Sequence, residues 1–414
     1  MRNPNDFNKT VRFADSSTFR PQGEIYHSRV ARISLWRSQN ITSFRRKEIS
    51  LQCWQPQVAD IATDGGIYNM EDKRVLLGMS GGIDSTYAAT ELRRRGYEVV
   101  GAFLKMTEES DVVSAVRAAE ALNVPLTVVD CTERFRDIVI GNFLSEYAAA
   151  RTPNPCIVCN RFVKIAALCE AAKEMGISAV ATGHYADVGF DDKSGRYYVR
   201  KAADPRKDQS YMLWRLTQEQ LAMLTLPLNS LLKSDIKAKA KELSLPNADA
   251  PESQEICFIP SDDYVSYIEE RLGKFPKGAF LDDGGKTVGT HEGIIRYTVG
   301  QRKGLGVSLG KPAFVTAIDP AANTVSLTLD EKKIFTDRLV CGDLNFMELK
   351  PGDYTDLPVE GKVRYAARPE RAWATVKGDR AEVFFERPVR AVTPGQSVVF
   401  YDGDRILFGG TIGE

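Results

Sequence analysis

The chain has 414 residues, which is too long for one compact core and predicts two or three domains. Hydrophobic residues make up 43% and charged residues 27%, so disordered, fibrous and disulfide-stapled classes are excluded. The 55 Lys and Arg balance the 55 Asp and Glu, so a polyanionic partner must be held by local basic patches.

No stretch approaches the roughly 18 apolar residues of a membrane span, and the N-terminus lacks the apolar core of a signal peptide. We therefore expect a cytoplasmic protein with no membrane partner, whose seven cysteines are reduced. Their spacing then favours catalysis or metal binding over a structural framework. The cysteines are Cys53, Cys131, Cys156, Cys159, Cys169, Cys257 and Cys341.

Residues 1–69 show no sustained helical or strand periodicity, and we expect no regular structure there. Scattered acidic residues argue against an Arg-rich transit peptide. Met70 stands directly before an apolar strand, as the start of a compact domain would. We interpret residues 1–69 as an extension outside the domains, translated from an upstream start codon.

From Arg74 the pattern alternates between strands and helices. This alternation predicts a doubly wound parallel sheet in a catalytic domain at 70–217. The predicted strands are 75–79, 99–104, 126–129 and 178–182, and the predicted helices are 86–95, 111–122, 134–149 and 161–175, with a loop at 152–160.

The remaining chain divides into two further predicted domains. A helical, Leu- and Lys-rich stretch at 218–245 and several Gly-rich turns predict a small mixed central domain at 218–332. Short alternating segments separated by Pro, Gly and Asp predict a small antiparallel β-barrel at 333–414. The predicted barrel strands include 363–367, 371–376, 381–385 and 397–400.

Residues 80–86 (SGGIDST) lie between a predicted buried strand and a helix. Glycines let the backbone wrap around an anion, while helix-start amides and hydroxyls donate to phosphate oxygens. An ordinary Gly-rich turn is the alternative, which the full string in its strand–turn–helix setting makes less favourable. The string lacks the Lys of the Walker loop, so it resembles instead the loop of the N-type ATP pyrophosphatases.

Two thiols, Cys156 and Cys159, stand before the predicted helix 161–175. The positive end of a helix dipole lowers a thiol pKa, which makes Cys159 the better-activated candidate. A zinc site is disfavoured because no second Cys-x-x-Cys occurs, whereas a three-cysteine cluster with Cys257 stays open. Cys257 alone, between Ile256 and Phe258, is typical of an inert buried thiol.

Further segments complete a pattern in chain order. Together with residues 80–86 they resemble the bacterial tRNA-specific 2-thiouridylases across residues 71–414, and nothing in 1–69 belongs to the pattern. One departure is Cys156, where many family members carry Asp. The segments are 154–160 (NPCIVCN), 182–186 (TGHYA), 207–211 (KDQSY), 253–260 (SQEICFIP), 297–306 (YTVGQRKGLG) and 393–397 (TPGQS).

The resemblance implies ATP-dependent 2-thiolation of wobble uridine 34 in the tRNAs for Lys, Glu and Gln. The C2 oxygen of the base is adenylated and then displaced by a persulfide sulfur. By position, Cys257 resembles the persulfide carrier and Cys159 the nucleophile that completes release, through a Cys159–Cys257 disulfide. A cysteine desulfurase or sulfur-relay protein is the implied persulfide donor, and Mg²⁺ is expected with ATP.

The resemblance leaves an alternative function open, which is that of another tRNA sulfurtransferase of the superfamily or of an amide-forming ATP pyrophosphatase.

The resemblance also implies binding residues for ATP and for tRNA. Because the expected ATP contacts end at Gly183, deletion after Lys333 is expected to leave the ATP site folded. The expected ATP contacts are Gly78, Met79, Ser80, Gly81, Gly82, Ile83, Asp84, Ser85, Leu104 and Gly183. The expected tRNA contacts are Asn154, Pro155, Cys156, His184, Lys207, Asp208, Gln209, Arg364, Tyr365 and Gln396.

Overall fold

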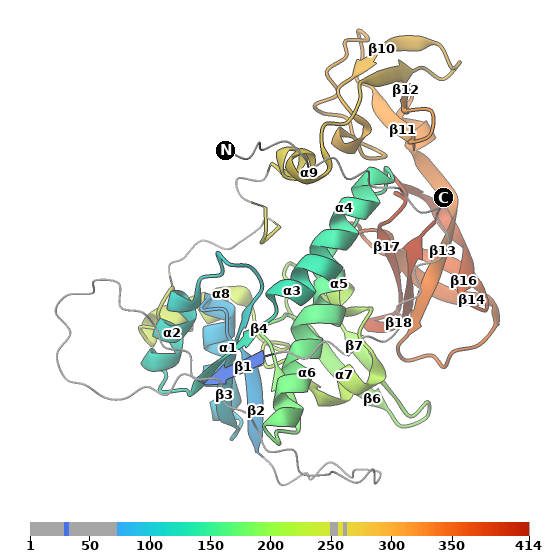
Figure 1. The fold of residues 1–414 in the computed structure, drawn as a ribbon. Coiled ribbons are helices and arrows are strands. Elements are labelled where there is room, and N and C mark those ends of the chain that lie inside the picture. Colours follow the sequence, from blue (N-terminus) through green and yellow to red (C-terminus); the bar gives the residue numbers. More distant parts are fainter. Residues whose placement is uncertain (1–28, 33–72, 249–255, 260–262, 414) are drawn as a thin grey trace, which may run out of the picture.

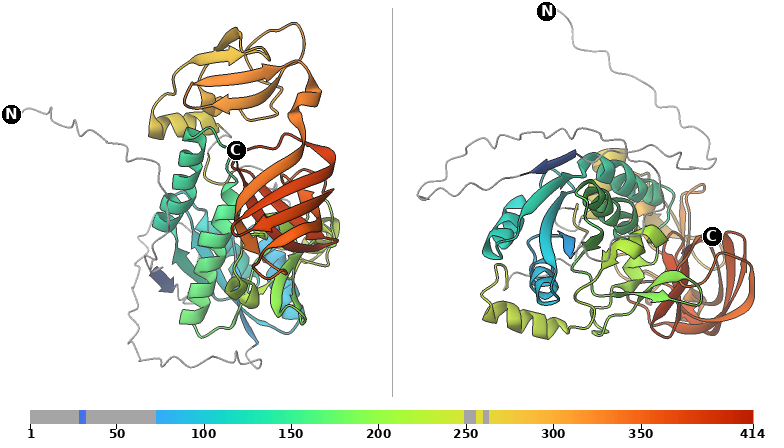
Figure 2. Two further views of the ribbon diagram at one scale, coloured as in Figure 1. Left: turned by 90° about the vertical axis from the view of Figure 1, so that its right-hand side faces the viewer. Right: turned by 90° about the horizontal axis from the view of Figure 1, so that it is seen from below.

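A computed structural model describes residues 73–248, 256–259 and 263–413, together with the backbone of residues 29–32 (Figure 1). Three units are visible: a sheet covered by helices, a small β unit beyond the end of a long helix, and a barrel beside the helical unit (Figures 1 and 2). No helix within the described ranges is long and apolar enough to cross a membrane.

The first unit contains a parallel sheet, which confirms the predicted doubly wound fold. Its strand order is β4-β3-β2-β5-β8, and all of these neighbours are parallel. Strand β1, residues 29–32, pairs with β4 as an antiparallel edge strand. The expectation of no regular structure in 1–69 is therefore wrong for these four residues. The rest of that segment lies outside the described residues. The strands are β1 (Arg29–Arg32), β2 (Arg74–Gly78), β3 (Glu98–Lys105), β4 (Leu126–Asp130), β5 (Ala179–Ala181) and β8 (Leu224–Thr225).

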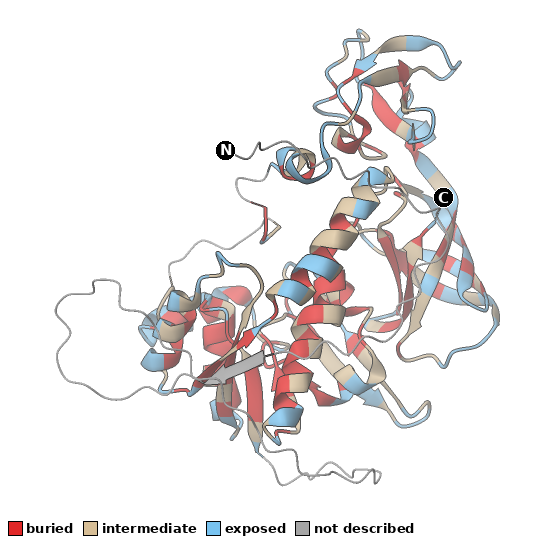
Figure 3. Ribbon diagram, viewed as in Figure 1, coloured by how far each residue is buried: buried red, intermediate tan, exposed pale blue. Residues whose placement is uncertain are grey.

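Helices cover both faces of the sheet, so its central strand is apolar on both sides. Val75 and Leu77 pack in one core with α1, α2 and α8, while Leu76 packs in a second core with α6. All three side chains are fully buried, as Figure 3 shows for the strands of this sheet. This explains the continuous apolar run in the sequence. The helices are α1 (Ile83–Arg94), α2 (Val112–Ala121), α6 (Ile165–Glu174) and α8 (Lys233–Glu242).

Two long helical stretches contain π-helical turns. The first runs through α3 (Thr132–Arg134), η1 (Phe135–Ile140) and α4 (Gly141–Ala148), close to the prediction. The second runs through α5, η2 and α6 and begins six residues before its predicted start. Asn154 caps it by accepting from the amide of Ile157, and Pro155 fits the first helical position. Cys156 and Cys159 therefore lie inside α5 (Pro155–Cys159), ahead of η2 (Asn160–Lys164), and the predicted loop 152–160 ends earlier.

The central unit consists of one helix and a four-stranded sheet with the order β10-β9-β12-β11. Phe280, Val315 and Val325 form its fully buried core. Because β8 pairs with β5 and α8 packs on α1, we propose that residues 218–248 belong with the catalytic unit, ahead of the central unit. The elements are α9 (Tyr264–Leu272), β9 (Gly278–Leu281), β10 (Thr287–His291), β11 (Phe314–Asp319) and β12 (Thr324–Thr328).

Six antiparallel strands form the predicted barrel, which the pairing of β13 with β18 closes. In β16 the side chains of Ala381, Val383 and Phe385 point into the core and their neighbours face solvent. The predicted strand 363–367 is wrong: the chain turns there, with the amide of Ala367 donating to Arg364. The strands are β13 (Phe335–Phe346), β14 (Tyr354–Lys362), β15 (Glu370–Lys377), β16 (Arg380–Arg390), β17 (Ser397–Asp402) and β18 (Arg405–Ile412).

The barrel is joined to the catalytic unit by a shared sheet and a buried interface. The hairpin β6 (Asp187–Asp191) and β7 (Arg196–Arg200) extends the barrel sheet beside β18. Trp214 is fully buried, and its indole lies directly against Gly409. The Tyr211 hydroxyl donates to the Ser397 carbonyl at 2.8 Å. Deletion after Lys333 would expose both rings at this interface, and the expectation that the ATP site stays folded in such a deletion remains a prediction.

We predict that Gly409→Ala weakens this interface. A Cβ at this position would lie 2.5 Å from Trp214 Cε3, so the tightly packed indole has to move. Overpacking of this kind costs about 1–3 kcal/mol and will lower the midpoint of thermal unfolding. In the control variant Gly342→Ala the nearest atom lies 3.6 Å away, an ordinary contact, and we expect a change within about 0.5 kcal/mol. Equal losses in both variants would contradict the prediction.

Candidate active site

The strand order places a ligand site between β2 and β5. From β2 the chain adds β3 and β4 on one side and then returns to add β5 and β8 on the other. Ligands of doubly wound sheets bind at such a switch point, beyond the carboxyl ends of the strands. Met79 and Ser80 follow β2 there, and Thr182 and Gly183 follow β5.

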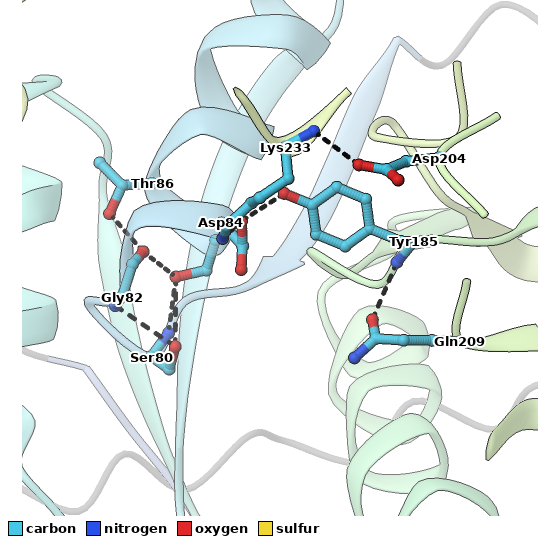
Figure 4. A network of polar contacts seen from close by, with 9 residues as sticks. Ser80, Gly82, Asp84, Thr86, Tyr185, Asp204, Gln209 and Lys233 are labelled. Atoms are coloured by element: carbon cyan, nitrogen blue, oxygen red, sulfur yellow. Dashed lines mark hydrogen bonds and ion pairs between the residues drawn. The ribbon is translucent and has the colours of Figure 1, made fainter. Parts of the chain in front are cut away.

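The segment 79–85, called the phosphate loop below, leads from β2 into α1 (Figure 4). Gly81 has a φ of +81°, and a Cβ there would collide with the backbone of Ser114, so only glycine fits. The Ser85 hydroxyl accepts from the amide of Ser80 and donates to the Gly82 carbonyl. The first amides of α1 lack partners within the helix and carry the positive end of its dipole. This arrangement suits a bound phosphate.

Asp84 in the first turn of α1 links three segments of the chain (Figure 4). Its Oδ1 accepts from the Tyr185 hydroxyl at 2.6 Å and from Lys233 Nζ at 2.5 Å. The Lys233 side chain is only 7% exposed and lies at the start of α8, where its backbone amide donates to Asp204. A buried cation therefore stands beside the phosphate loop. In the sequence this Lys stands in a Leu- and Lys-rich stretch that carries no signal of such a role.

Two of the expected ATP contacts are glycines in close packing. A Cβ on Gly183 would lie 3.0 Å from the backbone of Asp84, so the end of β5 is pressed against the first turn of α1. A Cβ on Gly78 would lie 3.2 Å from Leu168 Cδ1. Leu104 lies near the end of β3, the strand next to β2. Their contact with ATP stays a prediction.

Cys159 is buried at the end of α5. Burial raises the pKa of its thiol to about 11, because the loss of hydration outweighs the nearby charge of Lys164. The expectation that the helix dipole lowers this pKa is therefore wrong for this structure. Cys257 and Cys156 are both exposed and also act electrostatically on Cys159. Loss of hydration raises the pKa of the Cys257 thiol as well, and the charge of Lys164 lowers it by less.

An aromatic cluster brings the Cys257 segment to this helix. The Phe258 ring packs edge-on against Phe135 at 5.6 Å and Phe143 at 5.3 Å between centroids. Phe258 and Cys159 belong to one hydrophobic core, and η1 lies against α5. Residues far apart in the sequence are thereby gathered in one region.

The three thiols do not fit an iron–sulfur site in this arrangement. Within the described ranges, no three Cys, His, Asp or Glu side chains converge as metal ligands would. Magnesium bound with ATP needs fewer protein ligands, because the phosphates and water supply most of them, and Asp84 is the carboxylate within the phosphate loop. Its Oδ1 accepts hydrogen bonds from Tyr185 and Lys233.

His184 follows β5 and is neutral. Burial lowers the pKa of its imidazole to about 3, and the nearby Lys164 adds to this effect. Its Nδ1 lies 2.7 Å from the Thr182 hydroxyl. A neutral ring can stack on a base or form a hydrogen bond, but it offers no charge to a phosphate.

The expected tRNA contacts differ in their surroundings. The Asp208 carboxylate accepts from the amide and hydroxyl of Ser210, and the Gln209 Oε1 accepts from the amide of Tyr185. Asp208 thus holds its own loop, and Gln209 joins this loop to the segment after β5. Tyr365 is 39% exposed, and its ring lies 6.1 Å from the ring of Tyr211.

A second group of expected contacts meets at the joint between barrel and catalytic unit. The Gln396 amide donates to the Thr152 carbonyl at 2.8 Å, two residues before the cap at Asn154. Lys362 Nζ lies over the rings of both Tyr211 and Tyr365. The structure thus brings 208–211 next to 362–365, and the contact of these residues with tRNA stays a prediction.

Three family models match the chain in succession. They are described as a tRNA methyl transferase HUP domain at residues 73–261, a tRNA methyl transferase PRC-barrel domain at 265–328, and an aminomethyltransferase beta-barrel domain at 336–412. The tRNA-specific 2-thiouridylase MnmA of Acetivibrio thermocellus is 44% identical over 362 residues, covering 83% of this chain and 100% of that protein. The chain belongs to the tRNA-specific 2-thiouridylase family.

A further relative carries the same name. The 2-thiouridylase MnmA of Clostridioides difficile is 40% identical over 82% of this chain and 98% of that protein. Among solved structures, a 4-thiouridine synthetase–RNA complex with bound ATP aligns at a TM-score of 0.31 and 21% identity over 48% of this chain and 50% of that chain, which is too low to support an argument. In this 2-thiouridylase family member, Lys164 and Lys233 lie near the site but outside the segments of the family pattern, so the pattern gave no signal for them.

We predict that Asp84 and Lys233 are energetically coupled. Lys233→Met removes a charged hydrogen bond and leaves the Asp84 carboxylate with the Tyr185 hydroxyl but without its cation. We expect a cost of about 1–2 kcal/mol, because the Asp84 side chain is 34% exposed and partly hydrated. The double variant Asp84→Asn/Lys233→Met should lose less than the sum of the single variants in chemical denaturation. Lys239→Met, on the exposed face of the same helix, is the control. Additive losses would show that the pair is not coupled.

Proposed function

We propose that this protein uses ATP to adenylate the C2 oxygen of wobble uridine 34 in the tRNAs for Lys, Glu and Gln, and replaces that oxygen with sulfur. The observation that carries this proposal is the gathering of Cys159 and Cys257, from distant segments, in one region of a unit with a phosphate loop. The family models carry the description of a methyl transferase, but methyl transfer needs no pair of thiols. The relatives named 2-thiouridylase fit the thiol pair.

ATP binding is assigned to the phosphate loop and the neighbouring strand ends. The loop amides and hydroxyls would hold the β- and γ-phosphates, and Leu104 and Gly183 would border the nucleotide. Lys233 would balance negative charge beside Asp84. Magnesium, when bound, would neutralise phosphate charge, with the phosphates and water as its main ligands and Asp84 as the protein ligand.

Sulfur transfer follows from the thiols in three balanced steps. The C2 oxygen attacks the α-phosphorus and pyrophosphate leaves. The outer sulfur of a Cys257 persulfide attacks C2 and AMP leaves, so the base is joined to Cys257 through two sulfurs. The Cys159 thiolate then attacks Cys257 Sγ, which releases 2-thiouridine and forms a Cys159–Cys257 disulfide that cellular thiols reduce.

Recognition of tRNA is assigned to the joint between the catalytic unit and the barrel. Asn154, Pro155 and Cys156 at the start of α5 would border the flipped target base, since chemistry at C2 requires the base to leave the stack. Neutral His184 would contact this base. Lys207, Asp208, Gln209, Arg364, Tyr365 and Gln396 would contact the anticodon stem and loop. A cysteine desulfurase or sulfur-relay protein would supply the persulfide sulfur.

The function is tested by mass spectrometry of tRNA nucleosides from a strain that lacks this gene. We expect 2-thiouridine derivatives to disappear and 4-thiouridine and 2-thiocytidine to remain. Loss of another thionucleoside would identify a different tRNA sulfurtransferase. An unchanged nucleoside profile would favour an amide-forming enzyme.

We predict that Cys257→Ser separates the two half-reactions. The variant should release pyrophosphate in the presence of tRNA and ATP but form no 2-thiouridine, because the base is activated before sulfur arrives. Cys169→Ala, at a buried thiol on α6, is the control and should retain both activities. If Cys257→Ser remains folded but releases no pyrophosphate, the proposed order of steps is wrong.

A further inference from the structure

Lys164 ends the π-helical turn η2, five residues after Cys159. A π-turn bonds residues five apart, so it returns the chain to the side on which Cys159 lies. The Lys164 amide is accordingly within hydrogen-bonding reach of the Cys159 thiol. Such turns interrupt α-helices frequently at functional sites.

The Lys164 side chain is half-buried, and within the described ranges no carboxylate forms an ion pair with its ammonium. The titratable groups that feel its charge are the thiols of Cys159 and Cys257 and the imidazole of His184. Cys156 acts on the same two thiols. The charge of Lys164 thus lies among the groups proposed to carry out sulfur transfer.

The packing of Phe258 places Cys257 in this group independently of any charge. Phe258 is 8% exposed and is enclosed by Phe135, Phe143 and Tyr267, whose ring centroids lie 5.3 to 5.6 Å from its own. Its neighbour Ile259 is also buried in this core. Cys257 itself stays exposed beside this anchor, and its thiol feels the charge of Lys164.

Loss of hydration opposes the reaction that the two thiols are proposed to perform, through burial at Cys159 and through closely packed neighbours around the exposed Cys257. Both must become thiolates to take up or displace sulfur, and burial disfavours the charged form. A nearby cation offsets this cost, because it stabilises a thiolate without giving up its own proton. The proton lost by the thiol passes to solvent.

We propose that Lys164 stabilises the thiolates of Cys257 and Cys159 and thereby sets the rate of sulfur transfer. This inference rests on the proposed function and adds a residue to it. Lys164 acts through the two thiols and leaves adenylation to the phosphate loop.

The first test is site-resolved alkylation of the full chain with iodoacetamide between pH 6 and 10, read by mass spectrometry of each cysteine peptide. Lys164→Gln should slow alkylation of Cys257 by about threefold to tenfold at pH 7.5 and move its pH profile upward, since loss of a cation raises a thiol pKa. Lys164→Arg should restore the profile. Lys173→Gln is the matched control, because Lys173 acts on the distant Cys169 thiol.

The outcome is decisive in either direction. An unchanged Cys257 profile in Lys164→Gln, or an equal shift in Lys173→Gln, overturns the proposal. A lost tRNA affinity with unchanged alkylation overturns it too and assigns Lys164 to a phosphate contact.

A second measurement separates this proposal from the proposed function. With Cys257 loaded as a persulfide, Lys164→Gln should reduce 2-thiouridine formation more than tRNA-dependent pyrophosphate release. If the wild-type protein forms no 2-thiouridine, the proposed function fails, whereas the alkylation profile still decides the role of Lys164. If both activities fall equally while the profile stays unchanged, Lys164 is structural.

Discussion

The Asp84 carboxylate is the contact on which the candidate active site depends. It joins the first turn of α1 to Tyr185 after β5 and to Lys233 at the start of α8. The close approach of Gly183 to the same turn leaves no room for a side chain. The phosphate loop is therefore fixed by residues from three segments, and its amides keep their direction before any nucleotide arrives. Such preorganisation is what an anion site requires.

The thiols lie in an environment where two effects compete. Loss of hydration disfavours the thiolates of the buried Cys159 and the exposed Cys257, and Lys164 favours them. In this structure burial prevails, so most of the Cys159 thiol is protonated at neutral pH. A resting thiol of this kind is protected from unwanted oxidation, since the thiolate is the reactive form. The reactivity of the Cys159 thiol then depends on the charge of Lys164.

Much of the fold could be predicted because it depends on local pattern. The run 75–77 is apolar at every position since both faces of β2 are covered, and Gly81 marks the turn that only glycine allows. The role of Lys233 could not be predicted, because its partner lies 149 residues away and its own surroundings resemble a solvated helix. The raised pKa of Cys159 depends on tertiary packing in the same way. Local signals favoured a dipole effect, and burial by remote residues reversed it.

The sequence predicted the position of the phosphate loop, but it did not predict which side chains contact one another in the candidate site. The phosphate loop lies where its motif indicates, at the switch point of the sheet. Asp208 and Gln209 form internal hydrogen bonds that sequence spacing does not reveal. The segment 363–367 has strand-like composition, yet the turn at Arg364 carries Tyr365 to the face of Tyr211.

The sheet shared by β7 and β18 constrains how the catalytic unit and the barrel can change in evolution. The barrel contributes Gly409 against Trp214, Ser397 to Tyr211, and Asn345 to the carbonyls of Trp214 and Leu216. A chimaera that exchanged the barrel at Lys333 would therefore set foreign side chains against a conformation shaped by its original partner. Catalytic unit and barrel are expected to vary as a pair, with substitutions on one side of this interface accompanied by compensating changes on the other.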